Sequence, residues 1–357
     1  MPAVREFPAQ PAAAPPAWPA WPLLAAAQRQ PRPRPGASWR LALVPAEPLL
    51  SICMPTYHRP ALLAQALRSV GRLPPNVEVL VSDNSIANDL CGRVAGYYLG
   101  RQPAGQWRYY RNGPGQNVAD NFAACARRAR GHYIYHLHDD DFLRPGGLAA
   151  LVAELRAARG SCEALLFGVD LVDSRRQLLR RQYPARRQRL APAEALRRVL
   201  TNSSWVRIPS LVASRRAYAT FPPDVTQVNS VDTDAWAQFF GRWGVQLVPT
   251  CIAAYTVHPG ALTASMFNER SVERLLRIFD RTREQRLLPA PLLRRAQARY
   301  FHQFVLAGAW RSLRERDFAA ARQVLELLRL PALRELPVPL RWLPLRLGFT
   351  AAAWLGG

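Results

Sequence analysis

Beyond residue 48, the chain alternates short apolar runs with stretches in which apolar residues recur at helical spacing. Short apolar runs closed by polar or turn residues are typical of buried parallel strands. Strands that alternate with helices predict an α/β fold with a mostly parallel sheet flanked by helices. The predicted strands are 49–54, 77–81, 107–110 and 132–137, and the predicted helices are 61–70, 118–130 and 148–158.

The remainder of the chain divides into regions that differ in composition and in hydrophobic pattern. Residues 161–260 mix strand-like runs with helical stretches, and beyond residue 268 the pattern is helical and basic. Residues 1–46 contain 11 Pro and 13 Ala, a composition that cannot bury enough surface to offset its ordering entropy. We therefore expect a disordered tail over 1–46, an α/β domain over 47–268 and a basic helical region over 269–357. Within 161–260 the strand-like runs are 164–169, 246–249 and 252–257, and the helical stretches are 192–200 and 234–240.

Polar clusters follow three of the predicted strands. They are Thr56-Tyr57, Asp83-Asn84 and Asp139-Asp140-Asp141. Ligands of open α/β sheets bind beyond the carboxyl ends of the strands, so we expect these clusters to share one rim. Three consecutive carboxylates repel one another unless a cation compensates them, which favours a divalent metal site. The alternative is a solvated turn in which Asp141 caps the following helix.

Charge and cysteine content bear on the partners of the chain and on its cellular compartment. The net charge of +23 invites a nucleic-acid partner, but all 48 basic residues are arginine, a bias that suggests a GC-rich genome. The five cysteines are widely spaced without a C-x-x-C pair, which indicates buried thiols and not a disulfide framework or zinc site. We find no signal peptide and no apolar run long enough to span a membrane, so we expect a cytoplasmic chain.

Five segments together resemble the family 2 glycosyltransferases, which have the GT-A fold. Residues 51–59 are similar to the family's P-T-Y-N-R strand and loop, and 78–85 to its second strand. Gly115 precedes Asn121 with the family's spacing, and 131–133 followed by 139–145 resembles G-x-Y … D-x-D-D-x-x-x-P. The nearest subgroup is abequosyltransferase-like, which adds a deoxysugar to a lipid-linked saccharide. The resemblance implies a nucleotide-sugar site formed by Pro55, Thr56, Tyr57, Arg59, Asp83, Asn84, Asn121 and Asp139.

The same resemblance implies a divalent cation, Mg²⁺ or Mn²⁺. Aligned on Pro145, Asp140 falls on the second aspartate of D-x-D, whereas His138 stands where relatives have the first. The expected metal ligands are Asp140, with Asp141 and His258 in support; Asp141 is also placed for a capping role. His258 lies in a segment that resembles the family's R-x-H-x-x-S, although a lone histidine is more often structural.

Two aspartates compete for the role of general base. Residues 231–236 resemble the family's E-D-x-x-x-W segment, whose aspartate is the usual base, and the spacing to Trp236 selects Asp232. Asp234 is the alternate, and either residue could instead cap the helix that follows. The implied reaction is metal-assisted, inverting sugar transfer from a nucleotide-diphosphate sugar to a hydroxyl acceptor.

Alternatives remain at this stage for both function and membrane contact. A metal-dependent nucleotidyltransferase would share the sheet and the metal-binding aspartates, and a basic nucleic-acid-binding protein would use the positive field. The arginine-rich helices of 320–347 carry Leu and Trp and suit the surface of an anionic membrane, where a lipid-linked acceptor or polysaccharide precursor would be found. An ordinary helical subdomain explains them equally well.

Overall fold

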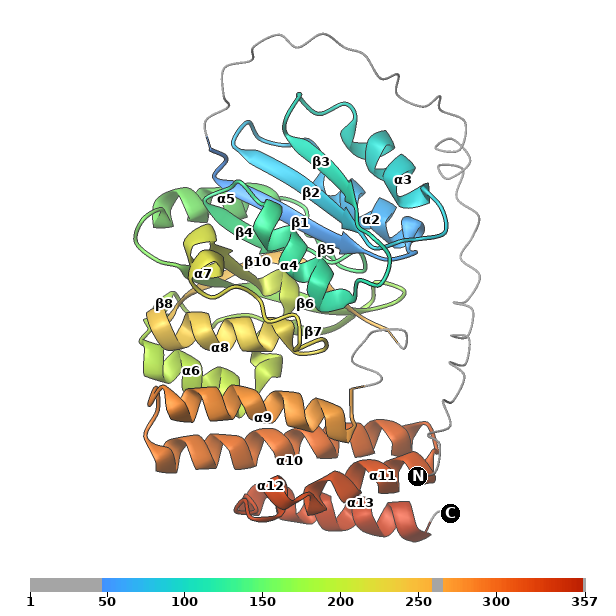
Figure 1. The fold of residues 1–357 in the computed structure, drawn as a ribbon, viewed down its shortest axis with the longest axis vertical. Coiled ribbons are helices and arrows are strands. Elements are labelled where there is room, and N and C mark those ends of the chain that lie inside the picture. Colours follow the sequence, from blue (N-terminus) through green and yellow to red (C-terminus); the bar gives the residue numbers. More distant parts are fainter. Residues whose placement is uncertain (1–46, 259–265, 356–357) are drawn as a thin grey trace. The chain divides into compact units, whose positions relative to one another are not determined.

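The computed structural model describes residues 47–258 and 266–355, and the expected tail 1–46 lies outside the described residues. Ten strands of the described chain form one mixed sheet with the order β3-β2-β1-β4-β9-β6-β10-β5, with β7 beside β6 and β8 beside β10 (Figure 1). The strands are β1 (Leu50–Thr56), β2 (Val77–Asp83), β3 (Trp107–Arg111), β4 (Tyr133–His136), β5 (Phe142–Leu143), β6 (Ala164–Asp173), β7 (Leu178–Gln182), β8 (Gln188–Leu190), β9 (Leu211–Ser214) and β10 (Val245–Val257).

The strands predicted from the apolar runs are confirmed, and six of the ten run in the same direction. Strands β1, β2, β3 and β4 pair in parallel, and β6 pairs in parallel with β10. The short strands β5, β7, β8 and β9 run antiparallel to them. The predicted mostly parallel α/β sheet is therefore confirmed.

The two predicted runs 246–249 and 252–257 are a single strand, β10. Its pairing with β6 shifts register between Leu247 and Cys251 and again before Ala253. Pro249 lies in this interval and has no N–H to donate to the ladder, which explains why the sequence pattern is interrupted there.

The helices begin and end close to the predicted positions. Asn117 caps α4 by accepting hydrogen bonds from the N–H groups of Ala119 and Asp120. The Asp120 carboxylate in turn accepts the backbone N–H of Asn117, which completes a capping box. The pattern missed α3, whose two glycines weaken the helical signal. The helices are α2 (Pro60–Val70), α3 (Leu90–Leu99), α4 (Val118–Arg128), α5 (Gly147–Ala158), α6 (Pro192–Thr201), α7 (Arg215–Thr220), α8 (Val231–Trp243), α9 (Glu269–Glu284), α10 (Ala290–Arg314), α11 (Phe318–Glu326), α12 (Pro331–Arg334) and α13 (Leu343–Leu355), with short 3₁₀ turns η1 (Ser203–Trp205), η2 (Ile208–Ser210), η4 (Leu327–Arg329) and η5 (Leu340–Trp342).

Two apolar cores hold these elements together. One contains Ile52, Tyr135 and Leu151 and joins β1 and β4 to α5. The other contains Phe240 of α8 together with Phe301 of α10, so the C-terminal helices share a core with the α/β elements. The expected boundary between 47–268 and 269–357 stays a prediction.

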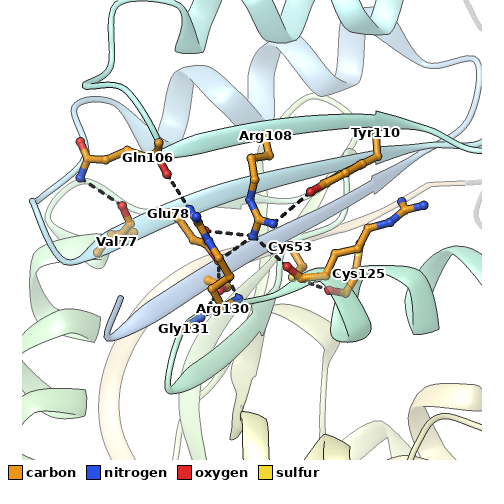
Figure 2. Close-up of polar contacts among 12 residues, drawn as sticks. Cys53, Val77, Glu78, Gln106, Arg108, Tyr110, Cys125, Arg130 and Gly131 are labelled. Atoms are coloured by element: carbon orange, nitrogen blue, oxygen red, sulfur yellow. Dashed lines mark hydrogen bonds and ion pairs between the residues drawn. The ribbon is translucent and has the colours of Figure 1, made fainter. Parts of the chain in front are cut away.

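A buried carboxylate fastens the amino-terminal half of β2 to its neighbours. Glu78 is 1% exposed and accepts hydrogen bonds from Ser51 Oγ at 2.6 Å, Arg108 Nη2 at 3.0 Å and the backbone N–H of Arg130 at 2.8 Å. Figure 2 shows the Arg108 and Arg130 guanidinium groups converging on it. Gly131 is required here because a Cβ at that position would lie 2.5 Å from the backbone nitrogen of Ser51. The cluster joins β1, β2, β3 and the loop before β4 at the end of the sheet opposite the predicted site.

Four of the five cysteines are buried, and all are free thiols, as expected from their spacing. Among the residues that the structure describes, none of the helices combines the length and apolar character needed to cross a bilayer.

Candidate functional site

The predicted rim forms where β1, β2 and β4 end. Parallel pairing sets Thr56 beside Asp83, and the segment after β4 returns Asp139 to Thr56. The Thr56 hydroxyl donates to Asp139 Oδ2 at 2.7 Å, and the Thr56 carbonyl accepts from Asn121 Nδ2 at 3.2 Å. The structure therefore brings together residues from four of the motifs that the sequence singled out.

Asp139 and Asp140 form a charged pair with Arg59. Arg59 Nη1 lies 3.5 Å from Asp139 Oδ1 and 3.1 Å from Asp140 Oδ2. Burial, followed by the neighbouring charge of Asp140, raises the pKa of Asp139 to about 7. Burial also acts to raise the pKa of Asp140, but the hydrogen bond from His258 and the nearby cationic groups outweigh it, so that pKa is lowered. The two carboxyl groups thus differ in proton affinity although they are adjacent.

His258, the residue after β10, contacts Asp140 of this pair. Its Nε2 lies 3.1 Å from Asp140 Oδ2, at the carboxyl end of β10. Asp141 holds the turn after β4 against the end of β10, because its Oδ1 accepts a hydrogen bond from the backbone N–H of Thr256 at 2.8 Å. Asp141 is 2% exposed, and burial raises its pKa well above the ordinary range. The carboxyl of Asp141 therefore braces β10 in this structure.

The predicted nucleoside side of the site is a network of short polar side chains. Asp83 accepts hydrogen bonds from the backbone N–H of Ser85 at 2.7 Å and from the Tyr109 hydroxyl at 2.6 Å. Asn84 Nδ2 donates to the carbonyl of Asn117 at 3.0 Å, which ties β2 to the start of α4. Both predicted residues are thus held in place by the protein.

Asn112 is the hub of this network, and the sequence reasoning gave it no such role. Its Nδ2 donates to Asn84 Oδ1 at 2.7 Å and to Asn121 Oδ1 at 3.2 Å, while its Oδ1 accepts from Arg128 Nη1 at 2.7 Å. The signal that could have identified it is its position, since Asn112 directly follows β3 just as Asn84 follows β2.

The loop after β1 presents the remaining predicted contacts. Pro55 is buried within β1, whereas the Tyr57 side chain is 56% exposed. His58 has a φ of 51°, and its N–H donates to Ser85 Oγ at 2.8 Å, which fixes the turn between Tyr57 and Arg59. The exposed Tyr57 ring packs edge-on against the His58 ring, with 4.5 Å between their centroids.

The two candidate bases occupy different surroundings on α8. Asp234 is 0% exposed and pairs with Arg281 of α9, whose Nη1 lies 2.6 Å from Asp234 Oδ1; Gln238 bonds its other oxygen. Asp232 is half-buried, and its hydrogen bonds from other described residues come from Thr233. Burial raises the pKa of Asp232 to about 6, and none of the described cationic side chains is among the groups that lower it. Burial raises the pKa of Asp234 as well, although Arg281 opposes that rise. The two aspartates therefore differ in their partners, since Asp234 has a cationic partner in Arg281 and Asp232 has none among the described residues.

Tyr255 of β10 and Arg207 contact each other near these carboxylates, and the sequence reasoning gave neither of them a role. Burial and the charges of Asp141, Asp140 and Asp232 raise the pKa of Tyr255 to about 12, opposed by Arg207. The Arg207 guanidinium stacks 5.1 Å from the centre of the Tyr255 ring. The charges of Asp140 and Asp232 both contribute to the raised pKa of Tyr255, after burial and Asp141.

The donor set at Asp140 is compatible with a hard or borderline divalent cation. Carboxylate oxygens and an imidazole nitrogen are ligands that Mg²⁺ or Mn²⁺ accepts. The neighbouring charge of Asp140 contributes, after burial, to the raised pKa of Asp139. A second set of potential ligands, Cys53, Cys125 and His136, has its ligand atoms within 4.8 Å of one another in the buried core. Thiols favour softer metals than those implied for the aspartates.

The fold is that of the GT-A glycosyltransferases. Residues 1–349 of Staphylococcus aureus TarS, solved with UDP-GlcNAc, align with a TM-score of 0.57 at 14% identity and cover 86% of this chain and 88% of that one. The mannosyltransferase PcManGT from Pyrobaculum calidifontis, solved with GDP-Man and Mn²⁺, aligns with a TM-score of 0.51 at 15% identity over 93% of this chain and 92% of that one. At these identities the likeness concerns the fold.

The sequence comparisons supply the family. The model of glycosyl transferase family 2 matches residues 51–220. Uncharacterized protein MT1568 of Mycobacterium tuberculosis (strain CDC 1551 / Oshkosh) is 30% identical over 228 residues, which are 60% of this chain and 68% of that protein. The chain belongs to glycosyl transferase family 2, and it is a glycosyltransferase.

Proposed function

We propose that the chain moves a sugar from a nucleotide-diphosphate sugar to an acceptor hydroxyl, with inversion at the anomeric carbon and with Mg²⁺ or Mn²⁺. The observation that carries this proposal is the contrast between two carboxylate groups around Tyr255. Asp139 and Asp140 are engaged by Arg59 and His258, whereas Asp232 has no cationic partner among the described residues. A donor needs compensated charge at its diphosphate, and an acceptor needs a free base.

On the donor side, Asp140 and His258 would hold the metal, and the metal would supply Lewis-acid neutralisation of the leaving diphosphate. Arg59 places a fixed positive charge beside the same carboxylates, 3.1 Å from Asp140. Asp83, Asn84 and Asn121 are proposed to position the nucleoside, since the Asn112 network holds Asn84 and Asn121 in one orientation. Tyr57, exposed at the rim, would cover the base or sugar.

On the acceptor side, Asp232 is proposed to accept the proton of the attacking hydroxyl. With a pKa of about 6 it is ionised at neutral pH, yet it is a stronger base than an ordinary aspartate. Attack from the face opposite the leaving diphosphate inverts the anomeric configuration. Asp234 is proposed to brace α8 against α9 through Arg281.

For substrate and location, we propose the subgroup that the motifs suggest. The donor would be a nucleotide deoxysugar or hexose, and the acceptor a lipid-linked saccharide or cell-surface polysaccharide precursor at the cytoplasmic face of a membrane. The support is the basic C-terminal region, which has 17 arginines and 7 acidic residues over 270–357.

A thermal-shift panel of nucleotide sugars, with and without Mn²⁺, tests the proposal. At a hundredfold excess over its Kd, a specific donor should stabilise the protein by roughly 2.7 kcal/mol, and only with the metal. A matched panel on Asp140→Asn should lose the shift. If no nucleotide sugar stabilises the wild-type protein under either condition, the proposed donor class is wrong.

A further inference from the structure

A cavity of about 290 Å³ lies within the C-terminal helices, apart from the residues of the transfer site. One part of its lining is apolar and the other is strongly basic, and it includes no carboxylate among the described residues. The lining comes from α10, η4, α12, α13 and the segment between the last two. Its residues are His302, Leu328, Arg329, Leu333, Arg334, Leu336, Val338 and Arg346.

His302 contributes a buried polar atom with no partner in the described part of the chain. The residue is 2% exposed, and its Nδ1 lies 2.8 Å from the carbonyl oxygen of Ala298. A carbonyl only accepts, so Nδ1 carries the proton and Nε2 is left as an acceptor. This buried Nε2 has no hydrogen-bond partner among the described residues. An unsatisfied buried polar atom costs stability, and a ligand in the cavity would remove that cost.

Two of the three arginines that line the cavity have no acidic partner among the described residues. Neither Arg334 nor Arg346 has an ion-pair or hydrogen-bond partner for its side chain in the described ranges, whereas Arg329 pairs with Glu326 at 2.8 Å. Burial lowers the pKa of His302, and the charge of Arg346 lowers it further, so Arg346 is close to the imidazole. Guanidinium groups that converge on one space favour a phosphate, which accepts several charge-assisted hydrogen bonds at once.

Large apolar side chains are exposed on the segments that form the cavity and on those that follow it. Val338 lines the cavity and is 38% exposed, Leu340 is 84% exposed, and Leu347, next to Arg346, is 63% exposed. Further exposed apolar side chains of the same region are Leu343, Leu345, Trp354 and Leu355. Large side chains exposed together in this way, beside basic residues, match the interface of an anionic bilayer.

We infer that this cavity binds a phosphate group, and that the group is the headgroup phosphate of a membrane lipid. Arg334 and Arg346 donate to the phosphate oxygens. Nε2 of His302 accepts a hydrogen bond from the P–OH of a singly protonated phosphomonoester headgroup, as in phosphatidic acid, while the leucines around the cavity contact the acyl region. This site rests on the membrane contact proposed above, but it does not depend on which sugar is transferred.

Flotation of the full chain with vesicles tests the site. The probes are vesicles of one part phosphatidic acid to four parts phosphatidylcholine, and vesicles of phosphatidylcholine alone. The variants are Arg346→Gln and Arg334→Gln, and the matched control is Arg314→Gln, which removes the same charge from an exposed position on α10 outside the cavity lining. Each cavity variant should weaken binding to the acidic vesicles roughly tenfold, the loss expected for a charge-assisted hydrogen bond. The control should bind nearly as the wild type does.

Inorganic phosphate is the second probe, with protection against thermal unfolding as the readout. Protection that Arg346→Gln abolishes supports a phosphate site, and if it occurs without vesicle binding, the ligand is a soluble phosphate compound and not a lipid. Equal losses for Arg314→Gln and Arg346→Gln would mean that only general surface charge attracts the membrane, which overturns the cavity site. Melting of each variant and binding of the nucleotide-sugar donor are measured in parallel. Unchanged donor binding separates a failure of this site from a failure of the proposed transfer reaction.

Discussion

Asp140 Oδ2 and His258 Nε2 lie 3.1 Å apart although 118 residues separate them in the chain. The contact joins the turn after β4 to the end of β10, and the backbone hydrogen bond from Thr256 to Asp141 holds the two segments in place. At the proposed donor site, this carboxylate and imidazole are the two groups best placed to bind a metal together. Asp140 is therefore the residue to test first.

We expect Asp140→Asn to weaken the joint binding of a nucleoside diphosphate and Mn²⁺ by at least roughly tenfold, because the amide keeps the shape but removes the charge that a cation needs. Titration calorimetry with both ligands measures it. Asp280→Asn, the same substitution at an exposed position of α9 whose partner is Arg283, is the control and should bind as wild type. Wild-type affinity in Asp140→Asn would show that the aspartate turn is structural.

Asp232→Asn and Asp234→Asn should fail in different ways. Asp232→Asn is expected to lower kcat by about 10²–10⁴ with donor binding intact, since it removes the proposed base and no buried ion pair. Asp234→Asn is expected to keep most of its kcat but to unfold more easily, by about 1–3 kcal/mol, because the charge facing Arg281 is lost. A transfer assay and denaturant unfolding on both variants distinguish them. The reverse pattern would make Asp234 the base.

The transfer rate should depend on pH through Asp232. Its pKa of about 6 means that it is deprotonated above that pH and protonated below it. A base works only when deprotonated, so kcat/KM should fall as the pH drops below about 6, by roughly tenfold per unit. A pH profile of the wild type and of the residual activity of Asp232→Asn checks this, because the limb centred near pH 6 should vanish in the variant, whereas a limb near pH 7 from Asp139 would remain in both. An acidic limb that persists in Asp232→Asn belongs to another group.

Glu78→Gln should destabilise the sheet without touching the site. Burial acts to raise the pKa of Glu78, but the hydrogen bonds from Ser51 and Arg130 and the charge of Arg108 outweigh it, so the pKa lies below its ordinary value of 4.5 (Figure 2). A lowered folded-state pKa contributes stability that is present above pH 4.5 and is lost as the pH falls through the folded-state value. We expect a loss of about 2–4 kcal/mol near neutral pH, shrinking in acid.

Urea unfolding at several pH values measures this difference. Glu154→Gln is the control, since the ion pair of Glu154 with Arg187 is at the surface and should contribute at most about 1 kcal/mol. Equal losses for the two variants at neutral pH would contradict a special role for the buried carboxylate.

Local pattern was sufficient for the α/β class, for the strands β1, β2 and β4 and for the shared rim. A buried strand must be apolar along its length, and parallel strands must end at one edge, so Thr56, Asp83 and Asp139 could be placed on that edge from the sequence. The family followed from motifs that lie on these same elements.

Only the tertiary structure decided which charges are compensated. The sequence favoured Asp232 by its spacing to Trp236 and kept Asp234 as the alternate, because nothing local shows that Arg281, on another helix, pairs with one and not the other. The same holds for the insertion of β9 between β4 and β6, for Asn112 as a hub and for the phosphate cavity. Each depends on contacts between residues far apart in the chain, and the periodicity of a segment carries information about its own faces but not about the partner that covers them.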